Sequence, residues 1–366
     1  MKITTLRRFE FSASRQLSNG RLHGNNFYGW AGVRGDIDPH TGMLINIVTL
    51  KSIVNQILDR YDHRNLNNSL GLIDANTVAV SQILWEDLQL HLPSEVELES
   101  LELAEMDEHA ALVEHDKSYW IVHGGFSAAH RTHAPKLSPE ENRRRYGICD
   151  NPTGHGHNYQ VEIALPPGAD INSQLWKTLD HRNLSLDLPE FANINVVTET
   201  IANYIAHLEP LSYRVRVWET PDFYAEYLPG DDLYRLGRRY RFHAAHRLNS
   251  PYISPEENRL IYGKCNRPDP HGHTYVALVN VEGRLDPMTE TAYDLACLDQ
   301  VAQEIFSPLD YTYLDRDIAY FADHPTTGEN IVAFLYDQFQ PKLGSSLASV
   351  QLWETANNQF VASRDA

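Results

Sequence analysis

The sequence repeats one series of short motifs three times, and this repetition constrains the fold more than any other feature. A phenylalanine-led motif occurs as FSASRQ from Phe11, FSAAHR from Phe126 and FHAAHR from Phe242. Three more motifs follow in the same order in each copy: HGNNF, HGHNY and HGHTY, then DHRNL, DHRNL and DYTYL, then AEM, WET and WET. We therefore expect three units, at residues 1–117, 118–231 and 232–366.

The periodicity between the motifs predicts the elements of each unit. Apolar residues recur at helical spacing in 50–58 and 298–306, and again in 80–84, 201–208 and 331–335, whereas YRVRVWET and ASVQLWET alternate as half-buried strands do. Each unit is thus predicted to run strand, strand, helix, helix, strand, strand. In the second unit only 21 residues separate Tyr159 from Asp180, against 35 in the other two units, so its first helix should be short or absent. The open edges of three such sheets would disappear if the sheets closed into one barrel.

Composition narrows the class of protein. The net charge of -18 argues against nucleic acid or an anionic membrane as a partner. No stretch approaches the roughly 18 apolar residues of a membrane span, and the N-terminus lacks an apolar signal region, so a cytoplasmic protein is expected. The three cysteines, Cys149, Cys265 and Cys297, are too few for a disulfide framework and should be free thiols.

Two triplets of histidines predict metal sites. In HGH the two histidines are two residues apart, so on a strand both side chains project from one face, and a third histidine lies 25 residues earlier. The alternative is ordinary strand histidines, but the recurrence of the same triplet favours zinc, with two ions per chain. No fourth protein ligand is evident, which is typical of a catalytic zinc. The first unit has Arg15, His23 and Asn25 instead and should be metal-free. The predicted ligands are His130, His155 and His157, and His246, His271 and His273.

A cysteine precedes each HGH motif by six residues, at Cys149 and Cys265. It could be a further metal ligand, a buried thiol or a base, since a histidine that lowers the pKa of a thiol makes it a base near neutral pH. Asp-His pairs at Asp62-His63 and Asp180-His181 could supply that histidine, whereas the third unit has Asp310-Tyr311 and has lost this imidazole.

The glutamates of the fourth motif are Glu105, Glu219 and Glu354. Each could be a solvated carboxylate on an outer face. Alternatively, a carboxylate can accept two parallel N–H bonds from an amidine-like edge such as that of a pterin.

FSAAHR, GICDNPTGHGHNY, LDHRNLSLD and VWET resemble the 6-pyruvoyltetrahydropterin synthase family, closely in the second and third units and more weakly in the first. The resemblance implies an α+β tunnelling fold in which three fused ββααββ units form a pseudo-trimeric 12-stranded antiparallel barrel ringed by helices. It implies a lyase of tetrahydrobiopterin biosynthesis that converts 7,8-dihydroneopterin triphosphate to 6-pyruvoyltetrahydropterin and triphosphate. Alternatives are 6-carboxytetrahydropterin synthase activity, a pterin-binding protein without turnover and, least expected, a generic zinc hydrolase.

The resemblance also assigns roles to residues. Cys149 or Cys265 would be the base, an Asp-His pair its activator, and Glu219 or Glu354 the pterin anchor, with Thr198 or Thr327 a further pterin contact. Arg131, Arg143, Arg144, Arg145, Arg247, Arg259 and Lys264 are candidate triphosphate contacts.

In this family the thiol and the Asp-His pair of one site come from neighbouring subunits, which a fused chain must reproduce between its units. The second and third units keep the histidine triplet and the cysteine, whereas the first and second units keep the Asp-His pair. This pattern favours sites that combine Cys149 with Asp62-His63 and Cys265 with Asp180-His181. The third interface, between the first unit without metal and Asp310-Tyr311, would then be inactive. Two chains could stack as a homodimer of pseudo-trimers.

Overall fold

The computed structural model describes residues 2–115 and 117–364, which fold into two compact units. The larger unit comprises Met1–Ser118, Arg239–Val279 and Ala296–Ala366 and holds the first sequence repeat and most of the third. The smaller comprises Tyr119–Arg238 and Asn280–Leu295 and holds the second repeat with one connecting segment of the third.

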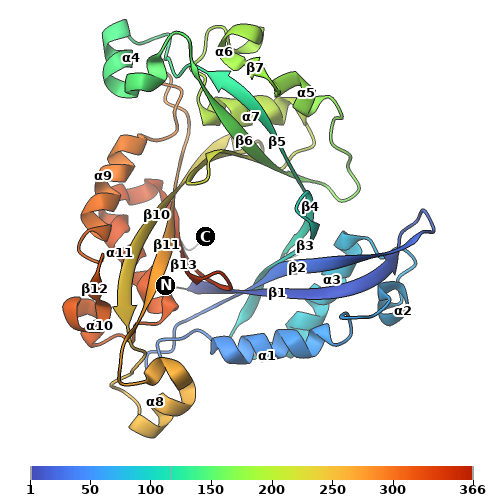
Figure 1. Cartoon of the computed structure of the whole chain (residues 1–366), viewed down its shortest axis with the longest axis vertical. Coiled ribbons are helices and arrows are strands. Elements are labelled where there is room, and N and C mark those ends of the chain that lie inside the picture. The colour runs from blue at the N-terminus through green and yellow to red at the C-terminus, as the bar shows by residue number, and fades with distance from the viewer. Residues whose placement is uncertain (1, 116, 365–366) are drawn as a thin grey trace. The chain divides into compact units, whose positions relative to one another are not determined.

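The first repeat is an antiparallel four-stranded sheet with helices on one face (Figure 1). Phe9, Phe11 and Phe27 point from alternate strand positions into a core shared with Leu50 and Leu84 of the helices. The elements are β1 (Ile3–Gln16), β2 (Leu22–Gly35), α1 (Ile47–Leu58), α2 (Leu66–Leu70), α3 (Thr77–His91), β3 (Glu97–Met106) and β4 (His109–Glu114).

The third repeat continues the same sheet in the larger unit, because its last strand pairs antiparallel with β1, with Ile3 opposite Ala362. The strands beyond it follow in the order β13, β11, β10 and β12. The elements are β10 (Leu233–His246), α8 (Pro255–Tyr262), the 3-10 turn η3 (Gly263–Asn266), β11 (His271–Gly283), α9 (Leu295–Phe306), β12 (Thr312–Tyr313), α10 (Leu314–Asp317), η4 (Ala319–Ala322), α11 (Gly328–Leu343), η5 (Gly344–Ser346), β13 (Leu347–Thr355) and β14 (Asn358–Ser363).

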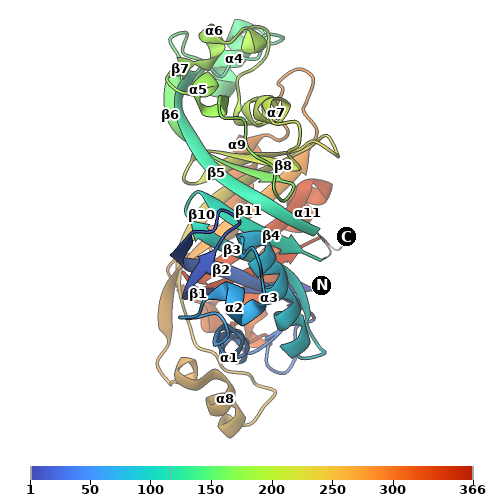
Figure 2. The ribbon, with the colours of Figure 1, turned by 90° about the vertical axis from the view of Figure 1, so that its right-hand side faces the viewer.

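The smaller unit is built on β5, β6, β8 and β9, which lie side by side in that order with the first part of β10 after them. Figure 2 shows α5 and α7 beside the long strands β5 and β6, and Phe126, Tyr159 and Ile201 lie in their common core. The elements are β5 (Lys117–His130), α4 (Pro139–Tyr146), η1 (Gly147–Asp150), β6 (His155–Leu165), α5 (Leu175–Leu179), β7 (Arg182–Asn183), α6 (Leu184–Asp187), η2 (Pro189–Phe191), α7 (Thr198–Leu208), β8 (Arg214–Thr220) and β9 (Phe223–Leu228).

The two main helices of each repeat fall where the periodicity predicts them, and the first helix of the second repeat is the five-residue α5, as its short connection requires. Helices α4 and α8 were not predicted. Each begins with a serine whose side chain accepts the N–H of a glutamate three residues on, followed by proline at the first helical position. Each ends at a glycine with φ of 54°, which turns the chain into the segment that holds the cysteine.

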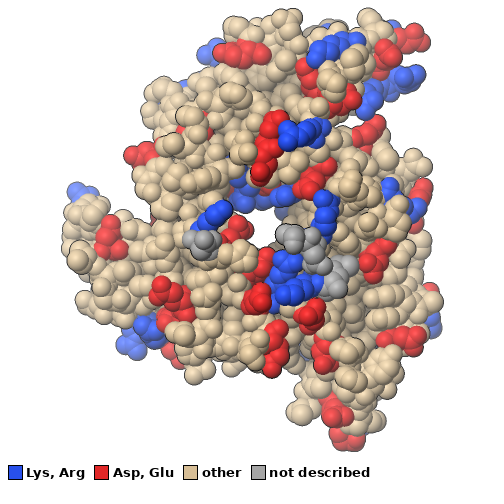
Figure 3. Space-filling view, turned by 180° about the vertical axis from the view of Figure 1, so that it is seen from behind, with Lys and Arg blue, Asp and Glu red and all other residues tan. Residues whose placement is uncertain are grey.

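Within the described part of the chain, no helix is long and apolar enough to cross a membrane. Acidic and basic side chains are interspersed over the face drawn in Figure 3.

Candidate metal centres

The first centre lies in the smaller unit, where β5 ends and β6 begins. His130 is directly opposite His155 in the antiparallel register, and His157 projects from the same face two residues further on. Glu219 at the end of β8 reaches the same point. One ligand atom of each of the four side chains lies within 4.8 Å of all the others.

The imidazoles are oriented as metal ligands are. His130 Nδ1 donates to the carbonyl oxygen of Val196 at 2.7 Å, which turns Nε2 toward the other histidines. His130 Nε2, His155 Nδ1 and His157 Nε2 are buried without a hydrogen-bond partner. Burial lowers the pKa of His130 and His155, which favours the neutral imidazole with a free lone pair. Such nitrogens fit a bound cation.

Glu219 joins this cluster from β8, the strand that pairs with β6 on the edge away from β5. Its Oε1 lies 3.4 Å from His157 Nε2, and its Oε2 accepts the hydroxyl of Thr198, the first residue of α7. The sequence indicated no fourth donor here, because Glu219 lies 62 residues beyond His157 and only the pairing of β6 with β8 brings the two together.

The second centre, in the larger unit, repeats this arrangement with His246, His271 and His273, whose ligand atoms also lie within 4.8 Å of one another. His246 Nδ1 donates to Thr326 O at 2.9 Å, burial lowers the pKa of His246 to about 3, and His273 Nε2 is buried without a partner. Glu354 Oε1 lies 3.6 Å from His246 Nε2, and burial raises the pKa of Glu354 to about 7. The two predicted triplets are therefore assembled, one in each unit.

In the first repeat the guanidinium of Arg15 takes the place of the cluster. Its Nε donates to His23 Nε2 at 3.3 Å and to Asn25 Oδ1 at 3.2 Å, and its Nη1 donates to Thr77 Oγ1 at 2.9 Å. Its Nη2 forms an ion pair with Glu105, which also accepts the Thr77 hydroxyl. These partners correspond to His155, His157, Thr198 and Glu219 of the second repeat. The side chain of Arg15 is only 2% exposed, so a fixed cation fills this position.

The candidate thiols lie on the turns η1 and η3. The N–H of Thr132 donates to Cys149 O and that of Leu248 to Cys265 O, both at 3.0 Å, which fixes each turn against the end of the metal-binding strand. Burial, and then Glu219 or Glu354 respectively, raises the pKa of both thiols. From the sequence we expected a histidine to lower the pKa of these thiols, whereas their surroundings in the protein raise it.

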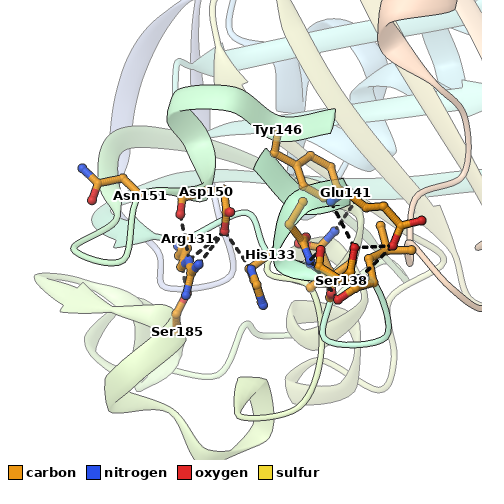
Figure 4. Close-up of polar contacts among 12 residues, drawn as sticks. Arg131, His133, Ser138, Glu141, Tyr146, Asp150, Asn151 and Ser185 are labelled. Carbon is orange, nitrogen blue, oxygen red and sulfur yellow. Dashed lines mark hydrogen bonds and ion pairs between the residues drawn. The ribbon is translucent and has the colours of Figure 1, made fainter. Parts of the chain in front are cut away.

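Charged side chains hold the turn η1 in place at Asp150 (Figure 4). Asp150 Oδ1 accepts from Arg131 Nη2 at 2.6 Å and from His133 Nδ1 at 2.7 Å, and Arg131 N donates to Ser185 Oγ at 2.9 Å. Arg131, a candidate triphosphate contact, is therefore paired with Asp150 within the protein.

The Asp-His pairs lie beside the strands that carry the first motif of their repeats. Asp180 Oδ1 accepts the N–H of Ser127 at 2.8 Å, and Asp180 Oδ2 lies 2.7 Å from His181 Nδ1. The chain continues into β7, which pairs parallel with β5 at Ala128 and Ala129, on the edge of β5 away from β6. An open pocket of about 320 Å³ lies here, lined by Ser127, Ala128, Ala129, Gly156, His157, Asn158, His181 and Arg182.

Asp62 and His63 repeat this geometry, with Ser12 N donating to Asp62 Oδ1 at 2.8 Å and His63 Nδ1 2.9 Å from Asp62 Oδ2. A pocket of about 560 Å³ lies beside His63. Each Asp-His pair thus lies along the edge of its strand that is not paired with the strand of the second motif.

The threonines predicted as substrate contacts are not equivalent. The carbonyl of Val196 accepts from His130, and the carbonyl of Thr326 accepts from His246, so Val196 and Thr326 are equivalent positions. Two residues after each lie Thr198 and Gly328, so Gly328 is the residue that corresponds to Thr198. Thr327 instead caps α11 and donates its hydroxyl to Gly42 O. Its role as a substrate contact stays a prediction.

Glu199 directly follows Thr198, and Glu329 directly follows Gly328. Both glutamates are buried, and the sequence did not single them out. Glu199 accepts the N–H of Ala292 at 3.1 Å, and Glu329 accepts that of Leu44 at 3.4 Å. Each thereby binds a connecting segment of a different repeat. Burial raises the pKa of both carboxyls to about 7.

The chain is therefore a protein of repeated α+β units, two of which carry a side-chain cluster that can hold a metal ion. The family model described as 6-pyruvoyl tetrahydropterin synthase matches three segments, residues 4–116, 121–229 and 235–365. The chain belongs to the 6-pyruvoyl tetrahydropterin synthase family.

Individual relatives match one repeat at a time. The 6-pyruvoyl tetrahydrobiopterin synthase of Homo sapiens is 43% identical over 129 residues, which are 35% of this chain and 89% of the human protein. That of Drosophila melanogaster is 37% identical over 126 residues, 34% of this chain and 75% of the relative. The solved 6-pyruvoyl tetrahydropterin synthase of Caenorhabditis elegans is 32% identical with a TM-score of 0.36, and the match covers 36% of this chain and 96% of that one.

The family confirms the fold class expected from the sequence, an α+β tunnelling fold made of three fused repeats. It also confirms that the chain is an enzyme, a carbon–oxygen lyase acting on phosphates. The unit boundaries at 117 and 231 and the roles of individual site residues stay predictions.

Proposed function

We propose that the chain is a zinc-dependent 6-pyruvoyltetrahydropterin synthase that converts 7,8-dihydroneopterin triphosphate to 6-pyruvoyltetrahydropterin and releases triphosphate. The observation that carries this proposal is the pair of clusters in which three imidazoles converge, joined by Glu219 in the first, and in which buried imidazole nitrogens lack partners. Neutral imidazoles in a group of three are the ligands that a catalytic zinc prefers. We expect two ions per chain.

Bound zinc would act as a Lewis acid that polarises the side-chain hydroxyls of the substrate and acidifies the adjacent C–H. Cys149 and Cys265 are the proposed bases, each on a turn fixed by a hydrogen bond to its carbonyl. A nearby dication would oppose the burial and the glutamates that raise the pKa of both thiols. Glu219 and Glu354 are the proposed pterin anchors, each with a carboxylate beside the imidazoles.

The Asp-His pairs would activate a thiol that belongs to another repeat or another chain. The position of Asp180 and His181 supports this, because they lie at the edge of β5 away from β6 and its two histidines. The proposed partners are Asp62-His63 for Cys149 and Asp180-His181 for Cys265. His63→Ala and Cys149→Ala should then each remove the same half of the activity, and the double variant no more than that half. An additive loss would contradict this pairing.

The test of the overall function is zinc content by mass spectrometry together with product identification from 7,8-dihydroneopterin triphosphate. We expect about two zinc ions per chain, release of triphosphate and formation of 6-pyruvoyltetrahydropterin. Acetaldehyde among the products would indicate 6-carboxytetrahydropterin synthase activity instead. A zinc-loaded protein that binds pterin without turnover would refute the enzymatic proposal for this substrate.

We further propose a homodimer of the three-repeat chain in the cytoplasm, without nucleic-acid or membrane partners. Mass photometry and cell fractionation measure these two properties directly.

A further inference from the structure

The connection between the second strand and the first main helix has the same form in the first and third repeats. Residues 38–41 and 286–289 both read Asp-Pro-x-Thr. In each, Oδ1 of the aspartate accepts the N–H groups of the third and fourth residues and the hydroxyl of the threonine, at 2.7–3.1 Å. These bonds form one compact turn in each connection. We call residues 38–46 and 286–294 the clamp segments.

In the larger unit, the clamp segment of the first repeat is bound by the third repeat. Glu329 Oε1 accepts the N–H of Leu44 at 3.4 Å and the hydroxyl of Thr5, also from the first repeat, at 3.3 Å. The hydroxyl of Thr327 donates to Gly42 O. These bonds hold the start of α11 to the first repeat.

In the smaller unit, the clamp segment of the third repeat is bound by the second repeat. Glu199 Oε1 accepts the N–H of Ala292 at 3.1 Å. Asn195 donates its side-chain N–H to Thr289 O at 2.8 Å and its backbone N–H to Oε2 of Glu290. The residues around the start of α7 are thus bound to the third repeat, as those of α11 are bound to the first.

The bound residues adjoin the carbonyl groups that orient the first histidine of each triplet. Thr326 and Val196 carry the carbonyls that accept from Nδ1 of His246 and His130, respectively. Each of these two residues is next in sequence to one that is hydrogen-bonded to a clamp segment. An acceptor at the outer nitrogen of a metal-binding histidine fixes the orientation of its ring, and losing such a group typically costs about 10–100-fold in metal affinity.

The repeat in which Arg15 fills the metal-binding position lacks both parts of this arrangement. At the position of the two glutamates it has Val78. The connection of the second repeat, residues 166–174, has no Asp-Pro-x-Thr motif, and its Asn172 donates its N–H to Glu209 of the same repeat at 2.9 Å. Clamp segment and histidine triplet therefore occur together.

We propose that each clamp segment is a positioning element for the metal centre that it lies against, so that each centre depends on a connection supplied by another repeat. Glu199 and Glu329 are the positioning residues that bind the clamp segments. The first repeat, which has no histidine triplet, is thereby required for tight metal binding by the third. The proposal rests on the zinc part of the proposed function and on no step of the reaction.

The test uses two backgrounds of the full chain that keep one centre each, with the HGH histidines of the other repeat changed to alanine (H155A/H157A and H271A/H273A). Asp38→Ala removes the acceptor of three bonds in the clamp segment of the first repeat. In the background that keeps the centre of the third repeat, it should weaken zinc binding by about 10–100-fold, measured by competition with a chromophoric chelator. In the other background it should change zinc affinity by less than about threefold.

Asp286→Ala is the matched control, because it removes the same acceptor from the other clamp segment. It should weaken zinc binding by about 10–100-fold at the centre of the second repeat and by less than about threefold at that of the third. Equal losses at both centres, or a loss below about threefold at the centre beside the altered clamp segment, would overturn the proposal.

A conservative variant separates positioning from a general loss of structure. Asp38→Asn keeps the Oδ1 acceptor, and asparagine forms the same kind of turn, so zinc affinity should stay within about threefold of the parent. A loss as large as that of Asp38→Ala would count against the proposal.

A second measurement requires neither turnover nor zinc. Exchange of the His246 Nδ1–H with water, followed by NMR in the full chain, should be roughly tenfold faster in Asp38→Ala, because the carbonyl of Thr326 is held less firmly. Unchanged exchange would show that the clamp segment does not orient this ring. If the parent chain binds zinc but releases no triphosphate, the proposed reaction fails and the affinity comparison still decides the role of the clamp segments. If the parent chain binds no zinc, the proposed function fails, and the exchange rate decides instead.

Discussion

Arg15→Met is expected to destabilise the larger unit strongly, although Arg15 has no proposed role in the chemistry. Methionine keeps the unbranched aliphatic stem of arginine but lacks its five N–H donors. The change leaves Glu105 without its cationic partner and removes the donors to His23, Asn25 and Thr77. The loss of stability depends on how far the groups that lose Arg15 can regain solvation or other partners.

Removing one partner of a buried ion pair costs about 3–5 kcal/mol, because the remaining charge stays desolvated. Glu105 is 15% exposed and still accepts the hydroxyl of Thr77, so its carboxylate can recover part of its solvation. We therefore expect the lower end of the range, about 3 kcal/mol. That free energy corresponds to roughly a hundredfold increase in the population of the opened state around β1 and β2.

Hydrogen exchange followed by mass spectrometry measures this locally, as the loss of protection in peptides covering β1, β2 and the start of α3. The matched control is Arg8→Met on the same strand, whose pair with Glu10 is exposed and should cost less than about 0.5 kcal/mol. Zinc content should stay at two in both variants. A protection loss for Arg15→Met no larger than that of Arg8→Met would refute the idea that the guanidinium replaces a metal ion.

Three further predictions concern the centres and the buried glutamates. Arg15→His with Asn25→His completes a triplet around His23, so zinc per chain should rise from two to three, and a value that stays at two would show that the first repeat cannot hold the ion. Glu219→Gln should raise KM more than it lowers kcat at unchanged zinc content, whereas loss of zinc would identify Glu219 as a ligand. Burial raises the pKa of Glu329 to about 7 in the folded chain, so its contribution to stability is full below the unfolded pKa of roughly 4.5 and is lost as pH rises through 7. Glu329→Gln should therefore make Tm higher than that of the parent at pH 8 and reduce its change between pH 5 and pH 8, and parallel Tm curves would contradict this.

The histidine triplets could be predicted from the sequence because they depend on properties of a strand. Two histidines two residues apart must share a face of any strand, and the recurrence of HGH with an earlier histidine marks the neighbouring strand. The short connection from Tyr159 to Asp180 likewise predicted the short α5 by length alone. The capped helices α4 and α8 were missed although Ser-Pro-Glu-Glu is a helix start that the sequence displays at Ser138 and Ser254.

The role of Arg15 could not be predicted in the same way. Its partners come from β2, α3 and β3, and nothing local in FSASRQ indicates which groups surround the guanidinium. The sequence predicted a repeat without metal, which stays a prediction, but it could not show that the guanidinium of Arg15 occupies the position. The contact of His243 with Asp310 is similar, because the signal was a single difference between FHAAHR and FSAAHR, and its partner lies 67 residues away.

These two exceptions share a physical cause. In each repeat the carboxylates are retained, as Glu105, Glu219 and Glu354 beside the metal-binding position and as Asp62, Asp180 and Asp310 beside the strand. The aspartates also accept backbone N–H groups, so losing one would leave a donor unsatisfied. An anion fixed in this way requires a compensating partner, but not a particular one, since a guanidinium or an imidazole from a neighbouring position can satisfy it. Counting histidines in the motifs therefore underestimates what a degenerate repeat retains, and the partner of each carboxylate is the better guide to its function.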